Sequence, residues 1–260
     1  MEAKTAIRMT DISFAYEGCE EWALSKASLE VFEGGITCIL GPNGCGKSTA
    51  LKVIAGILKP EEGEVMIDGM ELSSYSAKEM AKTVAAVHQK NYAPPDLTVR
   101  KLIGIGRTPY HTFFGSTDKK SDHEAVEEAM RVTDTARFAD TPVSSLSGGE
   151  MQRAWLAMAL AQGTKILLLD EITTYLDVHY QIGMMRLIKA LNRTQNKTIL
   201  MVLHDVNLAL QFSDYCILMK DGGVFLQGET SKVLQANTIA AVFDIPAQMI
   251  RFGNRRYCVF

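Results

Sequence analysis

The stretch GPNGCGKST at residues 41–49 constrains the fold of this chain more than any other segment. It follows the compact apolar run TCIL at 37–40 and precedes a helical pattern at 48–58. Its three glycines allow a tight turn between the two elements, because glycine adopts positive φ without steric cost. Apolar runs and helical patterns continue to alternate after residue 147, which is typical of a parallel sheet with right-handed crossovers. We therefore expect an α/β fold built around this turn.

Size and composition limit the class of protein. The 260 residues suffice for one large domain with an inserted lobe, and 47% hydrophobic with 22% charged residues is ordinary for a soluble protein. The net charge of −3 and the lack of a basic block argue against nucleic-acid binding. The apolar runs are too short to span a bilayer, and the N-terminus has no apolar core of signal-peptide length. We expect a soluble intracellular protein that reaches a membrane only through partners.

Cysteine usage points to a reducing compartment. The five cysteines are odd in number, are widely spaced and form no CxxC pair. This pattern predicts neither a disulfide framework nor a zinc site. The cysteines are Cys19, Cys38, Cys45, Cys216 and Cys258.

The chain changes character along its length. Residues 5–33 alternate apolar and polar positions, which predicts antiparallel strands, and GEVMIDG at 63–69 predicts another strand. Between 91 and 141 the pattern becomes helical, with helices at 99–105 and 121–138 and with Ser121 or Asp122 as the N-cap of the second. Further elements are expected as a helix ending at 162, a strand at 165–169, a helix at 178–192, strands at 198–203 and 215–219, and a hairpin turn at 221–223.

The segment 41–49 fits the pattern G-x-x-x-x-G-K-[ST] without a mismatch, and it stands between a strand and a helix as that motif requires. Backbone N–H groups of such a turn surround phosphate oxygens, and the helix N-terminus adds positive potential. Lys47 supplies a charge to the β- and γ-phosphates, and the Ser48 hydroxyl ligates Mg²⁺. The alternative is a structural glycine turn. The residues expected to contact a nucleotide here are Gly41, Pro42, Asn43, Gly44, Cys45, Gly46, Lys47, Ser48 and Thr49.

Cys45 lies inside this turn, two residues before Lys47. A nearby ammonium lowers a thiol pKa, so the side chain could be reactive. The alternative, which we favour, is a small residue that fills space.

Two adjacent acids end the apolar run LLLDE at 167–171. Side chains alternate along a strand, so Asp170 and Glu171 should point apart. In P-loop enzymes a carboxylate in the position of Asp170 holds Mg²⁺ through its water shell. Glu171 would then face the γ-phosphate and position or activate the attacking water. The alternative is a solvated turn. The four apolar residues at 166–169, which lead directly into the acids, argue against it.

The stretch SSLSGGE at 144–150 is a second element suited to anions. Ser147 and Glu150 form a capping box, so the stretch could simply start a helix. The box does not explain Gly148 and Gly149, since each glycine costs a helix interior about 1 kcal/mol relative to alanine. Two glycines in a first turn suggest that another group approaches the backbone closely. A second anion site makes sense if two chains share nucleotides.

LSGGE at 146–150, shortly before ILLLDE at 166–171, resembles the signature of ATP-binding cassette (ABC) ATPases, and the resemblance runs along the whole chain. It implies a P-loop NTPase with a mixed or parallel sheet core, an N-terminal antiparallel β subdomain and an inserted helical subdomain. The expected layout is a single domain over 1–260, with the core at 1–90 and 155–260 and the helical subdomain at about 91–154.

The same resemblance implies a head-to-tail dimer that binds ATP and Mg²⁺. Ser147, Gly148, Gly149 and Glu150 of one subunit would contact nucleotide held by Lys47 of the other. Other residues match family positions: Tyr16 stacks on adenine, Gln89 senses Mg²⁺ and contacts the membrane partner, Asp177 communicates across the dimer, and His204 hydrogen-bonds the γ-phosphate. The implied catalytic set is Glu171, His204, Lys47 and Gln89, and the implied metal ligands are Ser48, Gln89 and Asp170. By themselves, Tyr16 could be an ordinary strand aromatic and His204 a structural histidine.

Three stretches resemble the ATPases of iron-chelate and cobalamin importers. They are LTVRKLIGIGRTPYHTFFG at 97–115, TTYLDVHYQ at 173–181 and LHDVNLALQFSD at 203–214; Tyr110, between Pro109 and His111, is a small departure. The resemblance implies that ATP hydrolysis drives import of an iron–siderophore, haem or cobalamin. The partners would be transmembrane permease subunits and, indirectly, a periplasmic or lipoprotein substrate-binding protein. The ATPase would lie at the cytoplasmic face of the membrane.

Other functions stay open at this point. One is an importer ATPase for another substrate, and another is a soluble cassette protein of iron–sulfur assembly, DNA repair or translation. The single cassette, without a long coiled-coil insert or a basic face, argues against the last two. A third is a P-loop kinase for a small molecule, against which the Gly148-Gly149 element argues.

Ile172 departs from the family, which usually has proline after the glutamate. Proline restricts the residue before it to extended conformations, so Ile172 removes that restraint from Glu171. We expect Glu171 to keep its place and Ile172→Pro to be tolerated.

Overall fold

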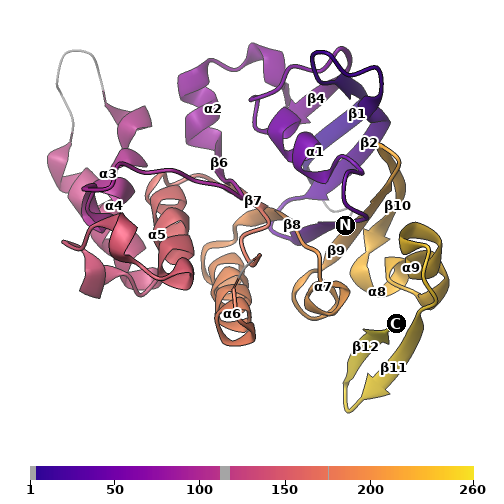
Figure 1. Cartoon of the computed structure of the whole chain (residues 1–260). Coiled ribbons are helices and arrows are strands. Elements are labelled where there is room, and N and C mark those ends of the chain that lie inside the picture. The colour runs from indigo at the N-terminus through magenta and orange to yellow at the C-terminus, as the bar shows by residue number, and fades with distance from the viewer. Residues whose placement is uncertain (1–3, 112–117, 175) are drawn as a thin grey trace. The chain divides into compact units, whose positions relative to one another are not determined.

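The computed structural model describes residues 4–111, 118–174 and 176–260. Positions 112–115 of the GRTPYHTFFG stretch, and Tyr175 in TTYLDVHYQ, lie outside the described residues. The chain divides into two compact units (Figure 1). Unit 1 comprises Met1–Tyr75 and Lys189–Phe260, and unit 2 comprises Ser76–Ile188.

Unit 1 contains an antiparallel sheet, as the alternation at 5–33 predicts. Its strand order is β2-β1-β4-β5. Ile7, Met9 and Ile12 of the first strand are almost fully buried, so one face of the sheet supplies core. The strands are β1 (Thr5–Ala15), β2 (Trp22–Phe32), β4 (Glu62–Ile67) and β5 (Met70–Glu71).

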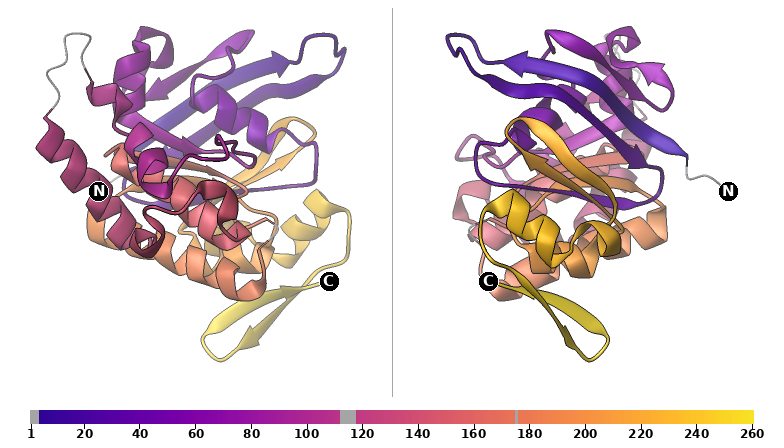
Figure 2. Two further views of the ribbon diagram at one scale, coloured as in Figure 1. Left: turned by 60° about the vertical axis from the view of Figure 1, so that its left-hand side comes forward. Right: turned by 90° about the vertical axis from the view of Figure 1, so that its right-hand side faces the viewer.

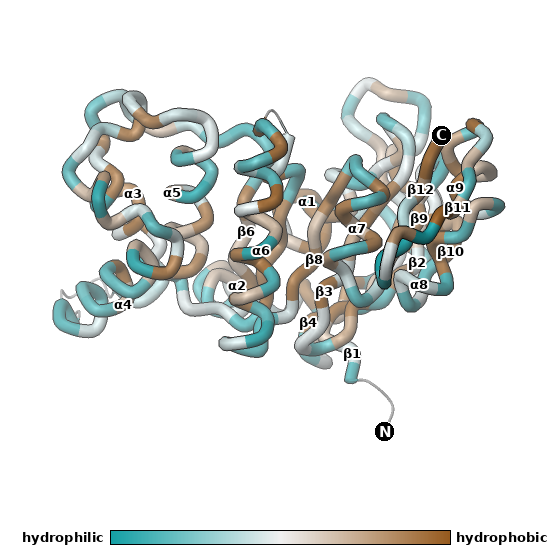
Figure 3. The backbone as a smooth tube through the Cα atoms, turned by 90° about the horizontal axis from the view of Figure 1, so that it is seen from below, coloured by the Kyte–Doolittle hydropathy of each residue, from teal (hydrophilic) through white to brown (hydrophobic). Residues whose placement is uncertain are grey.

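A second group of strands in unit 1 is mostly parallel. β3 (Ile36–Leu40) lies between β8 (Thr198–Val202) and β9 (Tyr215–Lys220) and is parallel to both. All residues of β3 and β8 are buried, which explains their unbroken apolar runs, drawn largely brown in Figure 3. β10 (Gly223–Glu229) pairs antiparallel with β9 through the predicted hairpin turn.

Helices connect these strands, and a hairpin ends the unit. β11 (Gln248–Phe252) and β12 (Arg255–Val259) form an antiparallel ribbon that projects from the rest of unit 1 (Figure 2). The Asn207 side chain anchors it, because its amide donates to Cys258 O at 3.0 Å and its oxygen accepts from Cys258 N at 2.8 Å. The helices are α1 (Lys47–Ile54), α7 (Val206–Phe212), α8 (Thr230–Val233), α9 (Ala236–Phe243) and a 3₁₀ turn at Leu72–Ser74.

Unit 2 pairs two parallel strands with a cluster of helices. β6 (Val84–Val87) and β7 (Ile166–Asp170) are in register, with Val87 opposite Leu169. Leu102, Ile103, Met130 and Leu156 are fully buried among the helices. The helices are α2 (Ala77–Thr83), α3 (Val99–Ile105), α4 (Lys119–Val132), α5 (Gly148–Ala161) and the start of α6 (Val178–Gln195), with 3₁₀ turns at Thr108–Tyr110, Ala136–Phe138 and Val143–Ser145.

The start and end of α4 differ from the sequence prediction. Its N-cap is Asp118, not Ser121 or Asp122, because the Asp118 carboxylate accepts from the N–H groups of Lys120 and Ser121. The helix ends at Val132 rather than near 138. Asp134 adopts a left-handed conformation at φ 56°, which ends the helix, and a separate 3₁₀ turn follows.

Candidate active site

The glycine-rich turn at 41–49 joins β3 to α1. Lys47 is 5% exposed, and its ammonium donates to Gly41 O at 2.9 Å and to Pro42 O at 2.7 Å. The turn therefore wraps around its own lysine and holds the charge at its centre. Such an ammonium can exchange these carbonyls for phosphate oxygens.

Gly46 sets the start of α1 and must be glycine. Its φ is 96°, and an added Cβ would lie 2.4 Å from the carbonyl oxygen of Ala23. No side chain caps the helix at Gly46, and no acid stands in its first turn. The positive end of α1 is thus presented to the turn without a carboxylate, which is the arrangement that favours a bound anion.

Tyr16 lies beside this turn. Its phenol is hydrogen-bonded to the Thr49 hydroxyl at 3.1 Å, and its ring packs edge-on against Phe14 with centroids 5.0 Å apart. The side chain keeps 39% exposure. The structure therefore brings Tyr16 to the phosphate loop and leaves ring surface available for stacking.

Burial governs the thiol of Cys45. The side chain is 5% exposed, and burial raises its pKa above the ordinary value, although the nearby Lys47 ammonium acts in the opposite direction. Since the thiolate is the reactive form, a raised pKa favours the space-filling interpretation of Cys45 over the reactive one.

His204 projects from the same sheet edge as the phosphate loop. β3 and β8 are parallel neighbours with Ile39 opposite Val202, and Leu203 N donates to Ile39 O at 3.1 Å. The carboxyl ends of the two strands therefore meet. His204 is exposed, two residues beyond the end of β8.

Unit 2 brings Gln89 and Glu171 together. Each lies two residues beyond the paired positions Val87 and Leu169, and the Gln89 amide donates to Glu171 Oε2 at 2.6 Å. The Thr174 hydroxyl lies 3.4 Å from the same oxygen. Asp170, the last residue of β7, is 4% exposed and Glu171 is 9% exposed. Two buried carboxylates at a strand end are not a solvated turn, so that alternative is wrong.

The backbone changes direction between the two acids. Glu171 adopts a left-handed conformation with φ 52°, so the chain leaves the strand after Asp170. The sequence prediction placed both acids on one extended strand, whereas β7 ends at Asp170 and Glu171 already belongs to the turn. A residue before proline avoids helical conformations. The left-handed Glu171 is therefore incompatible with the expectation that Ile172→Pro is tolerated.

Ser147 caps α5 as predicted. Its hydroxyl accepts from Glu150 N, and the Glu150 carboxylate accepts from Ser147 N at 3.0 Å and from the hydroxyl at 2.7 Å. These hydrogen bonds hold the pKa of Glu150 below its ordinary value. Glu150 is thereby engaged within its own helix turn.

The two glycines that follow have different surroundings. Gly148 is exposed, and a Cβ added there would meet nothing within 4 Å. Gly149 is buried, and a Cβ added there would lie 2.5 Å from Cδ1 of Tyr180. Only Gly148 therefore offers open backbone, while a tyrosine of the same chain approaches Gly149. Sequence reasoning missed Tyr180. The signal was an aromatic residue three positions after Asp177, in the first turn of α6.

The predicted site residues thus form two groups. Unit 1 holds the loop 41–49, Tyr16 and His204. Unit 2 holds Gln89, the acid pair, the segment 147–150 and Asp177, whose carboxylate accepts from Tyr180 N at 3.0 Å.

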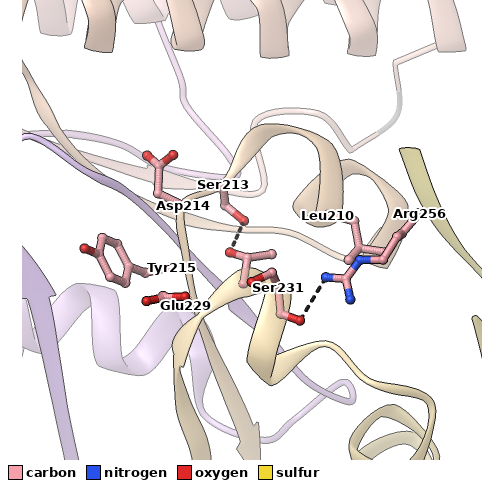
Figure 4. Close-up of a pocket in the computed structure, with 8 residues that line it drawn as sticks. Leu210, Ser213, Asp214, Tyr215, Glu229, Ser231 and Arg256 are labelled. Atoms are coloured by element: carbon pink, nitrogen blue, oxygen red, sulfur yellow. Dashed lines mark hydrogen bonds between the residues drawn. The ribbon is translucent and has the colours of Figure 1, made fainter. Parts of the chain in front are cut away.

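A polar cavity of about 370 Å³ in unit 1 contains none of these residues (Figure 4). It lies at the opposite edge of the sheet, because Tyr215 in its wall begins β9, which is parallel to β3. Its polar groups already have protein partners: Ser213 bonds Thr230 at 3.0 Å, and Arg256 donates to Ser231 O at 2.9 Å. This cavity was not predicted, and it is not part of the candidate site.

A strand, a glycine-rich loop with a buried lysine and an uncapped helix define a P-loop nucleotide-binding protein. Comparison with known proteins narrows the class. The family model described as ABC transporter matches residues 24–174, which is more than half of the chain. The chain belongs to the ABC transporter family and is an ATPase of that family, so the small-molecule kinase alternative is no longer needed.

Individual relatives agree with this family. The iron(3+)-hydroxamate import ATP-binding protein FhuC of Bacillus subtilis is 42% identical over 86% of this chain and 82% of its own length. A metal-chelate-type ABC transporter in an inward-facing conformation has a TM-score of 0.84 at 25% identity, covering 98% of this chain and 96% of that one. A dimeric ATP-binding cassette in a post-hydrolysis state with ADP and Pi has a TM-score of 0.75 at 31% identity, covering 86% and 98%. The fold class predicted from the sequence is confirmed.

Within the part of the chain that the structure describes, no helix is both long and apolar enough to cross a membrane.

Proposed function

We propose that this chain is the ATP-hydrolysing subunit of an importer for iron chelates, with a siderophore complex as the first candidate cargo and haem or cobalamin as alternatives. The observation that carries the catalytic part is the Gln89–Glu171 hydrogen bond of 2.6 Å, which holds a buried carboxylate at a strand end. The cargo class follows from similarity to the hydroxamate importer subunit. We propose the layout of a single domain with a helical subdomain at about 91–154.

The roles in unit 1 follow from the loop geometry. Lys47 binds the β- and γ-phosphates, and the N–H groups of 41–49 with the uncapped start of α1 surround them. Tyr16, beside Thr49, stacks on the adenine. His204 donates to the γ-phosphate from the neighbouring strand end.

The roles in unit 2 follow from the acid pair. Glu171 accepts a proton from the attacking water or orients it, and Gln89 holds the carboxylate in place. Ser147 and Gly148 present the start of α5 to nucleotide bound by a second copy, with Gly149 and Glu150 supporting that turn. Asp177 communicates across the dimer.

We assign the magnesium ion to Ser48, Gln89 and Asp170, as the family resemblance implies. Their oxygen donors are of the type that Mg²⁺ takes, and the ion commonly binds one or two protein groups plus phosphates and water. Within residues 4–111, 118–174 and 176–260, no group of three or more His, Cys, Asp or Glu side chains could hold a metal, which is compatible with that mode. When bound, the ion neutralises charge on the transferring phosphoryl group.

The proposed assembly has two copies of this chain on two permease subunits at the cytoplasmic face of the membrane. A substrate-binding protein, periplasmic or lipoprotein, delivers the cargo to the permease and does not contact this chain.

Two variants test the nucleotide site. Lys47→Ala should lose ATP affinity, because each charge-assisted hydrogen bond to phosphate contributes about 1.5–3 kcal/mol. Lys52→Ala, in the last turn of the same helix, is the matched control and should bind ATP as the wild type does. Equal affinities in both variants would refute the assignment of Lys47.

The shared site is tested at the cap of α5. Ser147→Arg should abolish hydrolysis while the chain still binds ATP. Since arginine also removes the N-cap, Ser147→Asp is the companion: it keeps a capping side chain and adds a negative charge. Normal turnover in both variants would contradict a nucleotide shared between copies.

Cargo and partners are tested by purification from membranes. The protein should co-purify with permease subunits, and vesicles containing that complex should take up ⁵⁵Fe-hydroxamate in an ATP-dependent way. Recovery without any membrane partner would favour the soluble cassette class, and transport of cobalamin alone would replace the cargo.

A further inference from the structure

The ring of Tyr180 occupies the space beside Gly149 where a side chain would otherwise extend. A Cβ added at Gly149 would lie 2.5 Å from Cδ1, 2.9 Å from Cε1 and 2.9 Å from Cγ of Tyr180. Contacts of 2.5 Å and 2.9 Å are closer than carbon atoms tolerate, and Cγ is the base of the ring, so rotation about the ring axis gives no relief. Any residue with a Cβ at position 149 would therefore clash with this tyrosine ring.

From this contact we infer that Tyr180 is a positioning residue for the reaction. Its ring sets where the first turn of α5 lies, and so orients Ser147 and Gly148. The inference rests on the proposed function, in which that turn binds nucleotide held by a second copy. It gives a role to Tyr180, which has none in the proposed function, and connects α6 with the first turn of α5.

The backbone of Tyr180 is held by the segment just before α6. Tyr180 N donates to the Asp177 carboxylate at 3.0 Å, and Gln181 N donates to Asp177 O at 2.9 Å. The Gln181 side chain donates to Leu176 O at 3.0 Å. Thr174 N in turn donates to Glu171 O at 3.0 Å. Both the turn after Glu171 and the start of α6 are therefore held by hydrogen bonds of their own.

A second close approach between α5 and α6 lies one turn further along. A Cβ added at Gly183 would lie 3.3 Å from a guanidinium nitrogen of Arg153. Arg153 also donates to Thr133 O at 3.1 Å. Residues 149 and 153 on α5 thus meet residues 180 and 183 on α6, the i, i+4 and i, i+3 spacing of two packed helix faces. A glycine stands at each point, opposite the Tyr180 ring at one and the Arg153 side chain at the other.

This packing makes distinct predictions for the two glycines. Gly149 is constrained by Tyr180, a group of the same chain. Among the described residues outside its own helix turn, no heavy atom lies within 4 Å of a Cβ added at Gly148, so a steric requirement for glycine there points to a group outside this chain. A double-mutant cycle separates the two cases, because only contacting groups show non-additive effects.

The experiment measures kcat, KM and ATP affinity of the full-length chain. Tyr180→Ala should lower kcat by about 10–10²-fold, since a displacement of 1 Å at a reacting group can cost that much, with ATP affinity unchanged because the loop of unit 1 is untouched. Tyr180→Phe should retain wild-type kcat, because the contacts with position 149 are made by ring carbons. Phe225→Ala, an aromatic truncation at a 49% exposed site of unit 1, is the control for lost surface area.

The cycle then compares Gly149→Ala and Gly148→Ala in two backgrounds. Gly149→Ala should lower kcat in the wild type and add little in Tyr180→Ala, whereas Gly148→Ala should cost the same in both. Equal losses from Gly149→Ala in both backgrounds, or a Tyr180→Ala variant with normal kcat, would overturn the positioning role. A wild-type chain that does not hydrolyse ATP at all would refute the proposed function and this role together.

Discussion

The Gln89 side-chain amide donates to Glu171 Oε2 at 2.6 Å, joining the ends of two parallel strands. The residues are 82 positions apart, and the register of β6 with β7 brings them together. A buried carboxylate that accepts a strong hydrogen bond is held in one orientation. Gln89 therefore helps to fix where the proposed base points.

Gln89→Ala should lower kcat by about tenfold or more while ATP binding by the loop at 41–49 stays unchanged, since general-base catalysis depends on the position of the base. Steady-state hydrolysis and a direct ATP-binding assay measure the two effects. Lys90→Ala, at the exposed neighbouring position, is the control. A loss of ATP affinity without a loss of kcat would contradict this role.

Gln89→Glu should shift the activity profile to higher pH. Two carboxylates at the distance of this hydrogen bond cannot both ionise easily, so one pKa of the pair rises and the base is protonated near neutral pH. Activity should recover as the pH increases. A profile that matches Gln89→Ala at every pH would show that the added charge does not reach Glu171.

Glu171→Gln should slow hydrolysis by about 10²–10⁴-fold and keep ATP bound, because it removes the base but keeps the shape and the hydrogen-bonding length of the side chain. The variant should accumulate as an ATP-bound dimer in size-exclusion chromatography. Unchanged turnover would remove Glu171 from the mechanism.

Ile172→Pro should destabilise the protein, contrary to what the sequence indicates. Glu171 has φ 52°, which a following proline disfavours, and Ile172 is 2% exposed, so its packing is also lost. We expect a loss of about 1–3 kcal/mol in the free energy of unfolding, together with a lower kcat. Ile172→Val, which keeps the backbone, should lose about 0.5–1.5 kcal/mol. Denaturant unfolding decides the matter: equal stability of Ile172→Pro and wild type would mean that the turn adapts.

Asp122→Asn should reduce stability in a pH-dependent way. Asp122 accepts from Arg107 Nε at 2.8 Å and lies 3.0 Å from His111 Nε2, and these partners hold its pKa below its ordinary value. A lowered folded-state pKa adds stability above the unfolded-state value of about 3.9, and this stability is lost as the pH falls through the folded-state pKa. The variant should lose about 1.5–3 kcal/mol at pH 7, and the difference from wild type should shrink below about pH 4. A difference that does not change with pH would point to packing instead of charge.

Alkylation should distinguish two cysteines. Cys19 is exposed, whereas Cys45 is buried with a raised pKa. Iodoacetamide should therefore modify Cys19 at least about tenfold faster, because the thiolate is the nucleophile and must be reached. Peptide mapping by mass spectrometry over time measures both rates. The contrary result, with Cys45 labelled as fast as Cys19, would restore the reactive interpretation of the loop thiol.

Local patterns predicted most of the elements correctly. Helix α3 was placed at its observed residues from the helical pattern at 99–105, and the structure adds Thr98 as its N-cap. The capping box at Ser147 and the hairpin turn after β9 were found for the same reason: the residues that specify such features are neighbours in the chain. The prediction for α4 was wrong because several acids and serines near its start could serve as caps. Only the folded backbone chooses Asp118 among them.

The sequence by itself determined the chemistry of this protein: the phosphate loop, the acid pair, the capped glycine turn and the family they belong to. These depend on residue types at short spacing, which the chain carries in its covalent order. Tertiary structure alone decided which partners the side chains have. Strand register brings Gln89 to Glu171, and helix packing places Tyr180 against Gly149. Such contacts join distant residues, and no local pattern encodes them, because they exist only once the elements have packed.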